Sequence, residues 1–175
     1  IDFLVWYFFA YIGIMRILQY NVQSLFSNKN TVEYYINQNS FEFCIFSEIF
    51  AVDDFDASCR LFNYNTFCKP RADGYGGCAI SVRKDIRASK VTFKTDLDIL
   101  IVKTHNLRSN IVLISVYLPP CRRNGLSFSV CRSELERMFD FIDNNDNVII
   151  AGDFNARSSR WGDYSDCPRG NFLYD

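Results

Sequence analysis

The chain has 175 residues, of which 49% are hydrophobic and 17% aromatic, with 19 basic and 20 acidic side chains. This composition excludes a disordered segment, and the length allows one domain with a full hydrophobic core. The formal net charge of −1 excludes a protein that coats nucleic acid through overall positive charge, so any contact with a polyanion must be local.

The chain opens with an apolar run, residues 3–15, that no charged side chain interrupts before Arg16. The run is shorter than the roughly 20 residues of a membrane span, and it lacks the basic start of a signal peptide. We predict that residues 1–14 are an extension outside a domain that covers residues 15–175. Seven scattered cysteines without a CxxC pair favour a reducing, intracellular location, nuclear or cytoplasmic, with no membrane partner.

The remaining sequence predicts strands that alternate with loops, and two helices. Alternating or continuous apolar residues predict strands over residues 16–22, 43–46, 64–68, 77–82, 91–94, 99–104, 111–118 and 148–151. A first helix is predicted over residues 31–38, capped by Asn30 or Thr31. A second is predicted over residues 129–144, with Leu135, Met138, Phe139 and Ile142 on its apolar face. This order predicts an α/β domain with mixed sheets.

Oxygen-bearing side chains directly follow three of the predicted strands. Asn21 and Glu48 follow the first two, and Asp153 and Asn155 follow the last, after Gly152, which we expect to turn the chain sharply. A turn capped by Glu48 and an Asx turn at Asp153 are the ordinary structural alternatives. Carboxylate and carboxamide oxygens without His or Cys suit a hard cation such as Mg²⁺.

Five segments resemble, in order, the motifs of the endonuclease/exonuclease/phosphatase superfamily: ILQYNVQSL, FCIFSEIF, GYGGCAISVRKDI, ISVYLPP and IIAGDFNARSSRWGD. The YLPP and GDFNA…WG forms most resemble the endonuclease domain of non-LTR retrotransposon polyproteins of the LINE or jockey type. The resemblance implies a DNase I-like α/β fold, a four-layer αββα sandwich of two mixed β-sheets. It also implies Mg²⁺-dependent phosphodiester hydrolysis, with Mn²⁺ as the alternative ion.

The resemblance also assigns roles to individual residues. It implies that Glu48 is the metal ligand and that Asn21 helps to hold the metal or the phosphate. Tyr117 would contact the scissile phosphate. Asp153 would orient or deprotonate the attacking water, and Asn155 would steady that water and the phosphate. DNA is the implied substrate, and a reverse transcriptase domain is expected downstream in a full-length polyprotein.

Two loops carry basic and aromatic side chains that we expect to contact DNA phosphates from two sides of a cleft. The expected contacts are Lys69 and Arg71 in one loop and Arg157, Arg160, Trp161 and Arg169 in the other, with Arg122 and Arg123 as further candidates. Trp161 either stacks on a base or seals the sandwich, and the sequence leaves both readings open.

The sequence also departs from the family pattern. Ser158 stands where the retroelement motif commonly carries a His, and Ile49 replaces a Thr after Glu48. The Ser-Asp-His block that ends the superfamily domain is not found before Asp175, so we expect the last strands of the second sheet to be missing. His105, predicted to be a surface or turn residue, does not replace that block.

These departures predict a weak or inactive nuclease, and they leave two alternatives to the retrotransposon endonuclease. One is another phosphoesterase of the superfamily, such as an apurinic/apyrimidinic repair nuclease, a deadenylase, or an inositol-phosphate or sphingomyelin hydrolase. The other is a non-enzymatic relic.

Overall fold

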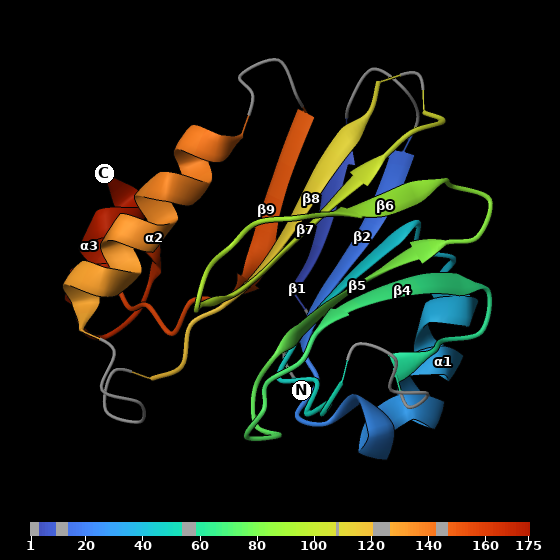
Figure 1. Cartoon of the computed structure of the whole chain (residues 1–175), viewed down its shortest axis with the longest axis horizontal. Helices are drawn as coiled ribbons and strands as arrows, with labels where there is room; N and C mark the ends of the chain where they lie inside the picture. Colours follow the sequence, from blue (N-terminus) through green and yellow to red (C-terminus); the bar gives the residue numbers. More distant parts are fainter. Residues whose placement is uncertain (1–3, 10–13, 54–58, 108, 121–126, 143–146) are drawn as a thin grey trace.

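The computed structural model describes residues 4–9, 14–53, 59–107, 109–120, 127–142 and 147–175. These residues form two mixed β-sheets and three α-helices (Figure 1). The strands are β1 (Leu4–Phe9), β2 (Ile14–Asn21), β3 (Phe43–Ser47), β4 (Tyr64–Lys69), β5 (Cys78–Arg83), β6 (Ala88–Val91), β7 (Asp98–Thr104), β8 (Ile111–Tyr117) and β9 (Asn147–Asp153). The helices are α1 (Leu25–Asn39), α2 (Phe128–Phe141) and α3 (Pro168–Tyr174).

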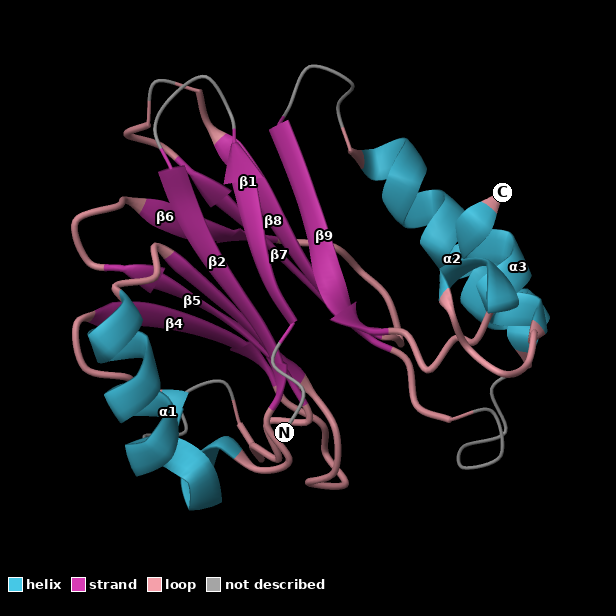
Figure 2. Cartoon of the chain, turned by 180° about the vertical axis from the view of Figure 1, so that it is seen from behind, coloured by secondary structure: helices cyan, strands magenta, loops and turns pink. Residues whose placement is uncertain are grey.

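The described strands are divided between a sheet in the order β1-β2-β3-β5-β4 and a sheet in the order β6-β7-β8-β9. Helix α1 lies against the first sheet, and α2 and α3 lie beside the second (Figure 2). Buried side chains form one apolar cluster between the two sheets and one under the helices on each outer side. This arrangement of layers confirms the predicted α/β sandwich of two mixed sheets.

Four strands form two parallel pairs, one in each sheet, and the two members of each pair end side by side. β2 and β3 are parallel neighbours whose pairing ends at Asn21 and Ser47. β8 and β9 are parallel neighbours in the other sheet, and their pairing ends at Tyr117 and Asp153. Because parallel neighbours end at the same edge of a sheet, each pair presents the residues that follow it in one place.

Most predicted elements are present, and the differences have local causes. β6 covers Ala88–Val91 rather than residues 91–94. Helix α1 begins after Ser24, not after Asn30 or Thr31, because the Ser24 hydroxyl accepts a hydrogen bond from the Ser27 amide at 3.2 Å. The first turns of α1 are mostly polar, so they carry little of the apolar periodicity that predicts a helix.

Helix α3 was not predicted, because its seven residues begin at a proline and give too short a pattern. Phe139, predicted to lie on the apolar face of the second helix, is 45% exposed, whereas Leu135 and Met138 are buried. The apolar stripe of α2 is therefore narrower than the sequence suggested.

The N-terminal segment contributes a strand: β1 runs antiparallel to β2, with Leu4 opposite Gln19 and Phe9 opposite Ile14. That residues 1–14 lie outside the domain stays a prediction. Among the described residues, no helix has the length and apolar character needed to cross a bilayer.

Gly152 has a different role from the sharp turn that we predicted. It lies inside β9 with φ of 148°, next to β8. A Cβ atom at this position would stand 1.9 Å from the Val116 carbonyl oxygen, which is far inside van der Waals contact. Only glycine therefore lets β9 lie at this distance from β8 and place Asp153 opposite Tyr117.

We predict that Gly152→Ala lowers the free energy of unfolding by about 2–3 kcal/mol or more, because the new methyl group overlaps backbone atoms that cannot move aside. Gly162→Ala is the matched control, since Gly162 also has a positive φ, 95°, but nothing lies within 4 Å of its Cβ position. Gly162→Ala should lower the free energy of unfolding by about 1 kcal/mol. Urea denaturation measures both, and equal losses would refute the steric explanation.

Candidate active site

The side chains that follow the two parallel strand pairs meet across the interface between the sheets. The Asn21 amide nitrogen donates a hydrogen bond to Asp153 Oδ2 at 2.9 Å, which joins the end of β2 to the end of β9. The other carboxylate oxygen of Asp153, Oδ1, accepts from the Asn155 backbone N–H at 2.9 Å. The Asx turn that we considered at Asp153 is thus present, and the same carboxylate also bridges the two sheets.

Glu48 and Tyr117 form the second half of this site. Burial raises the pKa of Tyr117 most, and the negative charges of the neighbouring Glu48 and Asp153 raise the pKa further. The phenol is therefore held in its protonated form, as a hydrogen-bond donor.

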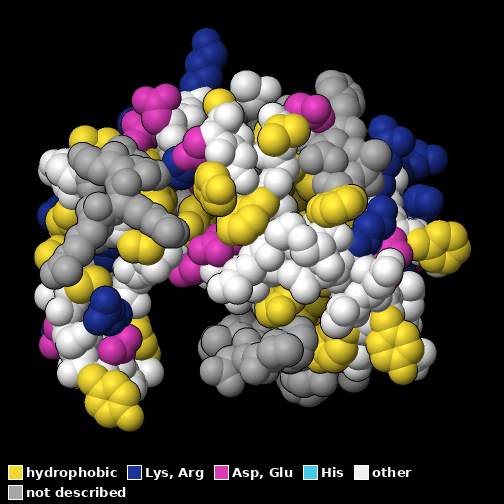
Figure 3. Space-filling model, turned by 90° about the horizontal axis from the view of Figure 1, so that it is seen from below, with side chains coloured by type: hydrophobic (Ala, Val, Ile, Leu, Met, Phe, Trp, Pro, Cys, Tyr) yellow, Lys and Arg dark blue, Asp and Glu magenta, His cyan; other side chains and the backbone are white. Residues whose placement is uncertain are grey.

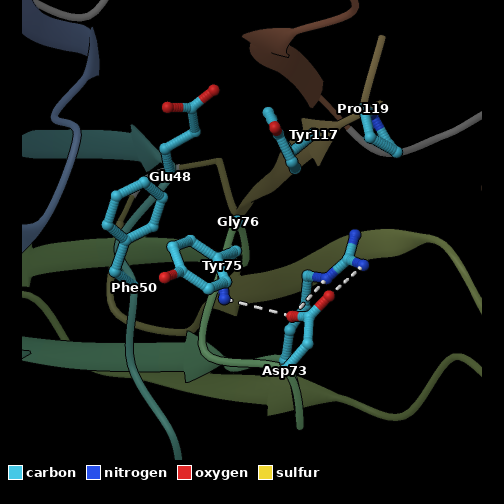
Figure 4. Close-up of a pocket in the computed structure, with 8 residues that line it drawn as sticks. Glu48, Phe50, Asp73, Tyr75, Gly76, Tyr117 and Pro119 are labelled. Atoms are coloured by element: carbon cyan, nitrogen blue, oxygen red, sulfur yellow. Dashed lines mark hydrogen bonds and ion pairs between the residues drawn. The ribbon is translucent and has the colours of Figure 1, made fainter. Parts of the chain in front are cut away.

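Both side chains face one cavity of about 230 Å³, shown in Figure 4. Its lining comes from the loops after β3, β4 and β8: Glu48, Phe50, Arg71, Asp73, Tyr75, Gly76, Tyr117 and Pro119. The structure therefore brings Asn21, Asp153 and Asn155 together by hydrogen bonds, and Glu48 and Tyr117 together at the cavity.

The loops of the site are held in strained backbone conformations. Glu48 and Phe50 both have φ of 55°, and Asn155 has φ of 45°. Left-handed φ values cost residues other than glycine about 1–3 kcal/mol each, so the surroundings must hold them in place. Backbone hydrogen bonds do so: Ser24 donates to Glu48 at 2.8 Å, and Phe50 donates to Gly76 at 3.0 Å.

Arg71, an expected DNA contact, lies in the lining of the cavity but is paired with two carboxylates. Its guanidinium lies 2.7 Å from Asp73 and 3.4 Å from Asp98. Burial raises the pKa of Asp98, and the charge of Arg71 opposes that rise. The positive charge of Arg71 is thus largely balanced within the protein.

Lys69 is not among the residues that line the cavity. Its ammonium donates to the backbone carbonyl oxygens of Thr95, at 2.9 Å, and Leu97. Burial lowers the pKa of Lys69. These hydrogen bonds hold Lys69 to the segment before β7, and a contact of Lys69 with DNA stays a prediction.

The loop after β9 does present exposed cationic and aromatic side chains. Arg157 and Arg160 are exposed, and the Arg160 guanidinium lies 4.1 Å from the Tyr174 ring centroid. Trp161 is 48% exposed, so it does not seal the sandwich. Arg169 is the exception, because it is only 2% exposed, and an external contact with DNA is excluded for it. Arg122 and Arg123 lie outside the described residues.

His105 is exposed and lies within 2.7 Å of the Ser89 hydroxyl, beside β6 and β7. It has no hydrogen bond to any of the site residues described above. The predicted placement of His105 at the surface is confirmed.

The donor set fits a hard divalent cation. Asn21 Oδ1 is buried and has no hydrogen-bond partner, because the amide directs its nitrogen to Asp153. The described residues contain no group of three or more His, Cys, Asp or Glu side chains that could hold an ion. If an ion binds, the Glu48 carboxylate and Asn21 Oδ1 would be the protein's oxygen ligands, and water or phosphate oxygens would supply the rest, as is usual for Mg²⁺.

The fold and the strand-end site place the chain in the DNase I-like class of α/β sandwiches. The chain belongs to the Endonuclease/Exonuclease/phosphatase family, which it matches over residues 18–174. Two relatives are RNA-directed DNA polymerases from the mobile element jockey. The Drosophila funebris protein is 31% identical over 122 residues, 66% of this chain, and the Drosophila melanogaster protein is 29% identical over 108 residues, 61% of this chain. These matches span 12% and 11% of the two relatives.

Solved structures share the fold. The endonuclease domain of TRAS1, a telomere-specific non-LTR retrotransposon, superposes with a TM-score of 0.70 at 22% identity, covering 91% of this chain and 69% of that one. An AP endonuclease from Archaeoglobus fulgidus gives a TM-score of 0.67 at 17% identity, covering 91% and 68%. The resemblance found in the sequence motifs is thereby confirmed, and the superfamily is generally dependent on a divalent metal.

One feature of the cavity was not predicted from the sequence, the aromatic pair of Tyr75 and Phe50. Their ring centroids are 5.7 Å apart in an edge-on arrangement, and Tyr75 is 71% exposed. The Asp73 carboxylate accepts from the Tyr75 backbone N–H at 3.1 Å, which holds the loop. The sequence signal was an aromatic residue between Gly74 and Gly76, in a loop, where binding residues are often found.

We predict that Tyr117 keeps its proton above the ordinary tyrosine pKa of about 10. The unfolded chain would release that proton near the ordinary tyrosine pKa. The free energy of unfolding should therefore fall as the pH rises above about 10. The phenolate absorbance of the native protein minus that of Tyr117→Phe should show no step up to about pH 11. Glu48→Gln should move the step to lower pH because it removes the adjacent charge. A normal Tyr117 titration would contradict the burial of the phenol beside the negative charge of Glu48.

Proposed function

We propose that this domain hydrolyses phosphodiester bonds in DNA, as the DNA-nicking endonuclease of a retrotransposon polyprotein, with Mg²⁺ held by Glu48 and Asn21. The observation that carries the proposal is the hydrogen bond from Asn21 to Asp153. It joins a residue with a free, buried amide oxygen to a carboxylate that has spare lone pairs. An ion ligand and a base for water thus lie side by side.

The contacts of each residue allow it a specific role in the hydrolysis. Asp153, fixed through both oxygens, orients a water molecule and accepts its proton. Tyr117, neutral and buried, donates to a phosphate oxygen. Asn155 donates one amide hydrogen to the Leu118 carbonyl oxygen at 2.8 Å and has a second one for the water or phosphate. A bound Mg²⁺ supplies the positive charge that stabilises the phosphoryl oxygens.

Only one histidine is present among the 175 residues, and it lies beside Ser89. The site therefore works without an imidazole from these residues. One positioned acid–base group or transition-state donor contributes on the order of 10²–10⁴ in rate, so we expect slow cleavage.

The relatives support DNA as the substrate and a reverse transcriptase as the downstream partner. TRAS1 is described as a retrotransposon with an endonuclease domain, and the jockey proteins are RNA-directed DNA polymerases. Because this chain spans about an eighth or less of the jockey relatives, their other activities extend to it only as proposals.

The proposal predicts slow, Mg²⁺-dependent nicking of supercoiled plasmid by the 175-residue chain. Glu48→Gln and Asp153→Asn should each remove the activity to background, because one loses the ion ligand and the other the base for water. Glu136→Gln is the control, since Glu136 is exposed on α2 and pairs with Arg132 at 2.8 Å. Nicking that survives either site substitution would refute the assignment. Faster cleavage of abasic duplex than of intact plasmid would favour the repair-nuclease alternative.

Metal binding can be measured without catalysis. Mg²⁺ at about one hundred times its Kd should stabilise the folded chain by about 2.7 kcal/mol. We predict a rise in Tm for the wild type and for Glu136→Gln, and a much smaller rise for Glu48→Gln. The same rise in all three proteins would place the ion elsewhere.

A further inference from the structure

Arg169 is the one arginine of the described residues with a fully buried side chain, at 2% exposure. It is the second residue of α3, which lies beside α2 in both cartoon views (Figures 1 and 2). No carboxylate of the described residues forms an ion pair with it, and its Nε has no hydrogen-bond partner. A buried guanidinium without an acidic partner is costly, so its contacts need an explanation.

Those contacts are with the backbone of the two loops that carry the site. Nη1 donates to the Pro119 carbonyl oxygen at 2.8 Å and to the Phe154 carbonyl oxygen at 3.4 Å. Pro119 lies two residues after Tyr117, and Phe154 lies between Asp153 and Asn155. Nη2 lies 3.7 Å from Cys131 Sγ of α2.

The guanidinium links the segments after β8 and β9, beyond the point where the regular pairing of these strands ends. Regular pairing of β8 with β9 ends at Tyr117 and Asp153. One step further, the Leu118 N–H donates to the Asp153 carbonyl oxygen at 2.9 Å, and the Asn155 side chain donates to the Leu118 carbonyl oxygen at 2.8 Å. Arg169 then joins the next carbonyl on each side, so it extends the coupling of the two strands into their loops.

The start of α3 is itself fixed on the loop after β9. The Cys167 N–H donates to the Arg157 carbonyl oxygen at 2.9 Å, and Cys167 Sγ accepts from the Arg157 N–H at 3.2 Å. A Cβ at Gly170 would stand 1.9 Å from the same carbonyl oxygen, so the helix backbone touches the loop directly. The arginine therefore has little freedom to move with respect to the loops that it joins.

We propose that Arg169 is a positioning residue, which sets the separation of Tyr117 from Asp153 and Asn155 without touching the substrate. This inference rests on the proposed nuclease function for its catalytic consequence. The coupling of the two loops is a claim about the folded chain alone.

The test compares Arg169→Met and Arg169→Lys with the control Arg132→Met, which alters an exposed arginine of α2. For Arg169→Met we expect kcat for nicking to fall roughly 10- to 100-fold, the effect of a small misplacement of reacting groups, with KM unchanged. Arg169→Lys should recover part of this loss, since an ammonium can still donate to a carbonyl. Arg132→Met should change neither quantity.

Hydrogen exchange supplies a readout that does not need catalysis. The amides of Leu118 and Asn155 should exchange faster in Arg169→Met than in the wild type, and Arg169→Lys gives the same comparison if the Met variant fails to fold. A lower Tm with unchanged kcat and unchanged exchange would overturn the proposal in favour of simple packing. A raised KM with a weaker salt dependence of DNA binding would overturn it in favour of a phosphate contact.

The two proposals fail separately. If the wild type shows no metal-dependent nicking, the proposed function is wrong, and amide exchange still decides whether Arg169 couples the loops. If the wild type nicks DNA and Arg169→Met does so at the same rate, only the positioning role is wrong.

Discussion

The hydrogen bond between Asn21 and Asp153 is the contact on which the site depends. It spans 132 positions in the sequence and joins the ends of strands in different sheets. Each strand belongs to a parallel pair, so the bond aligns the ends of both pairs. It also fixes the orientation of the Asn21 amide and leaves its oxygen buried without a partner, which is the observation behind the proposed cation site.

The pairing of the charged side chains around the site supports the proposed cation. On the face seen in Figure 3, hydrophobic side chains and one acidic patch lie near the middle, and both acidic and basic side chains lie toward the edge. Arg71 is paired with carboxylates and Lys69 with backbone carbonyls. Because both basic side chains already have partners inside the protein, we propose that a bound divalent ion would supply positive charge in the cavity. The strained loops and the buried Arg169 then serve to hold these few oxygen ligands in place.

The sequence predicted the sheets and most strands because these depend on local pattern and on motifs in fixed order. It did not predict the roles of Arg169, Lys69 and Gly152. All three are decided by what lies across the fold: two carbonyls for Arg169, the loop before β7 for Lys69, and the Val116 carbonyl for Gly152. The sequence shows that a residue is basic or small, but only the packing of the fold shows whether that residue faces solvent or a neighbouring backbone.

The most direct test of the central claim is an anomalous difference map from crystals of the chain soaked in MnCl₂. The account predicts one strong Mn²⁺ peak bound by the Glu48 carboxylate and by Asn21 Oδ1, in the cavity that Tyr117 lines. A peak at other carboxylates, with Asn21 Oδ1 left without an ion, would contradict it.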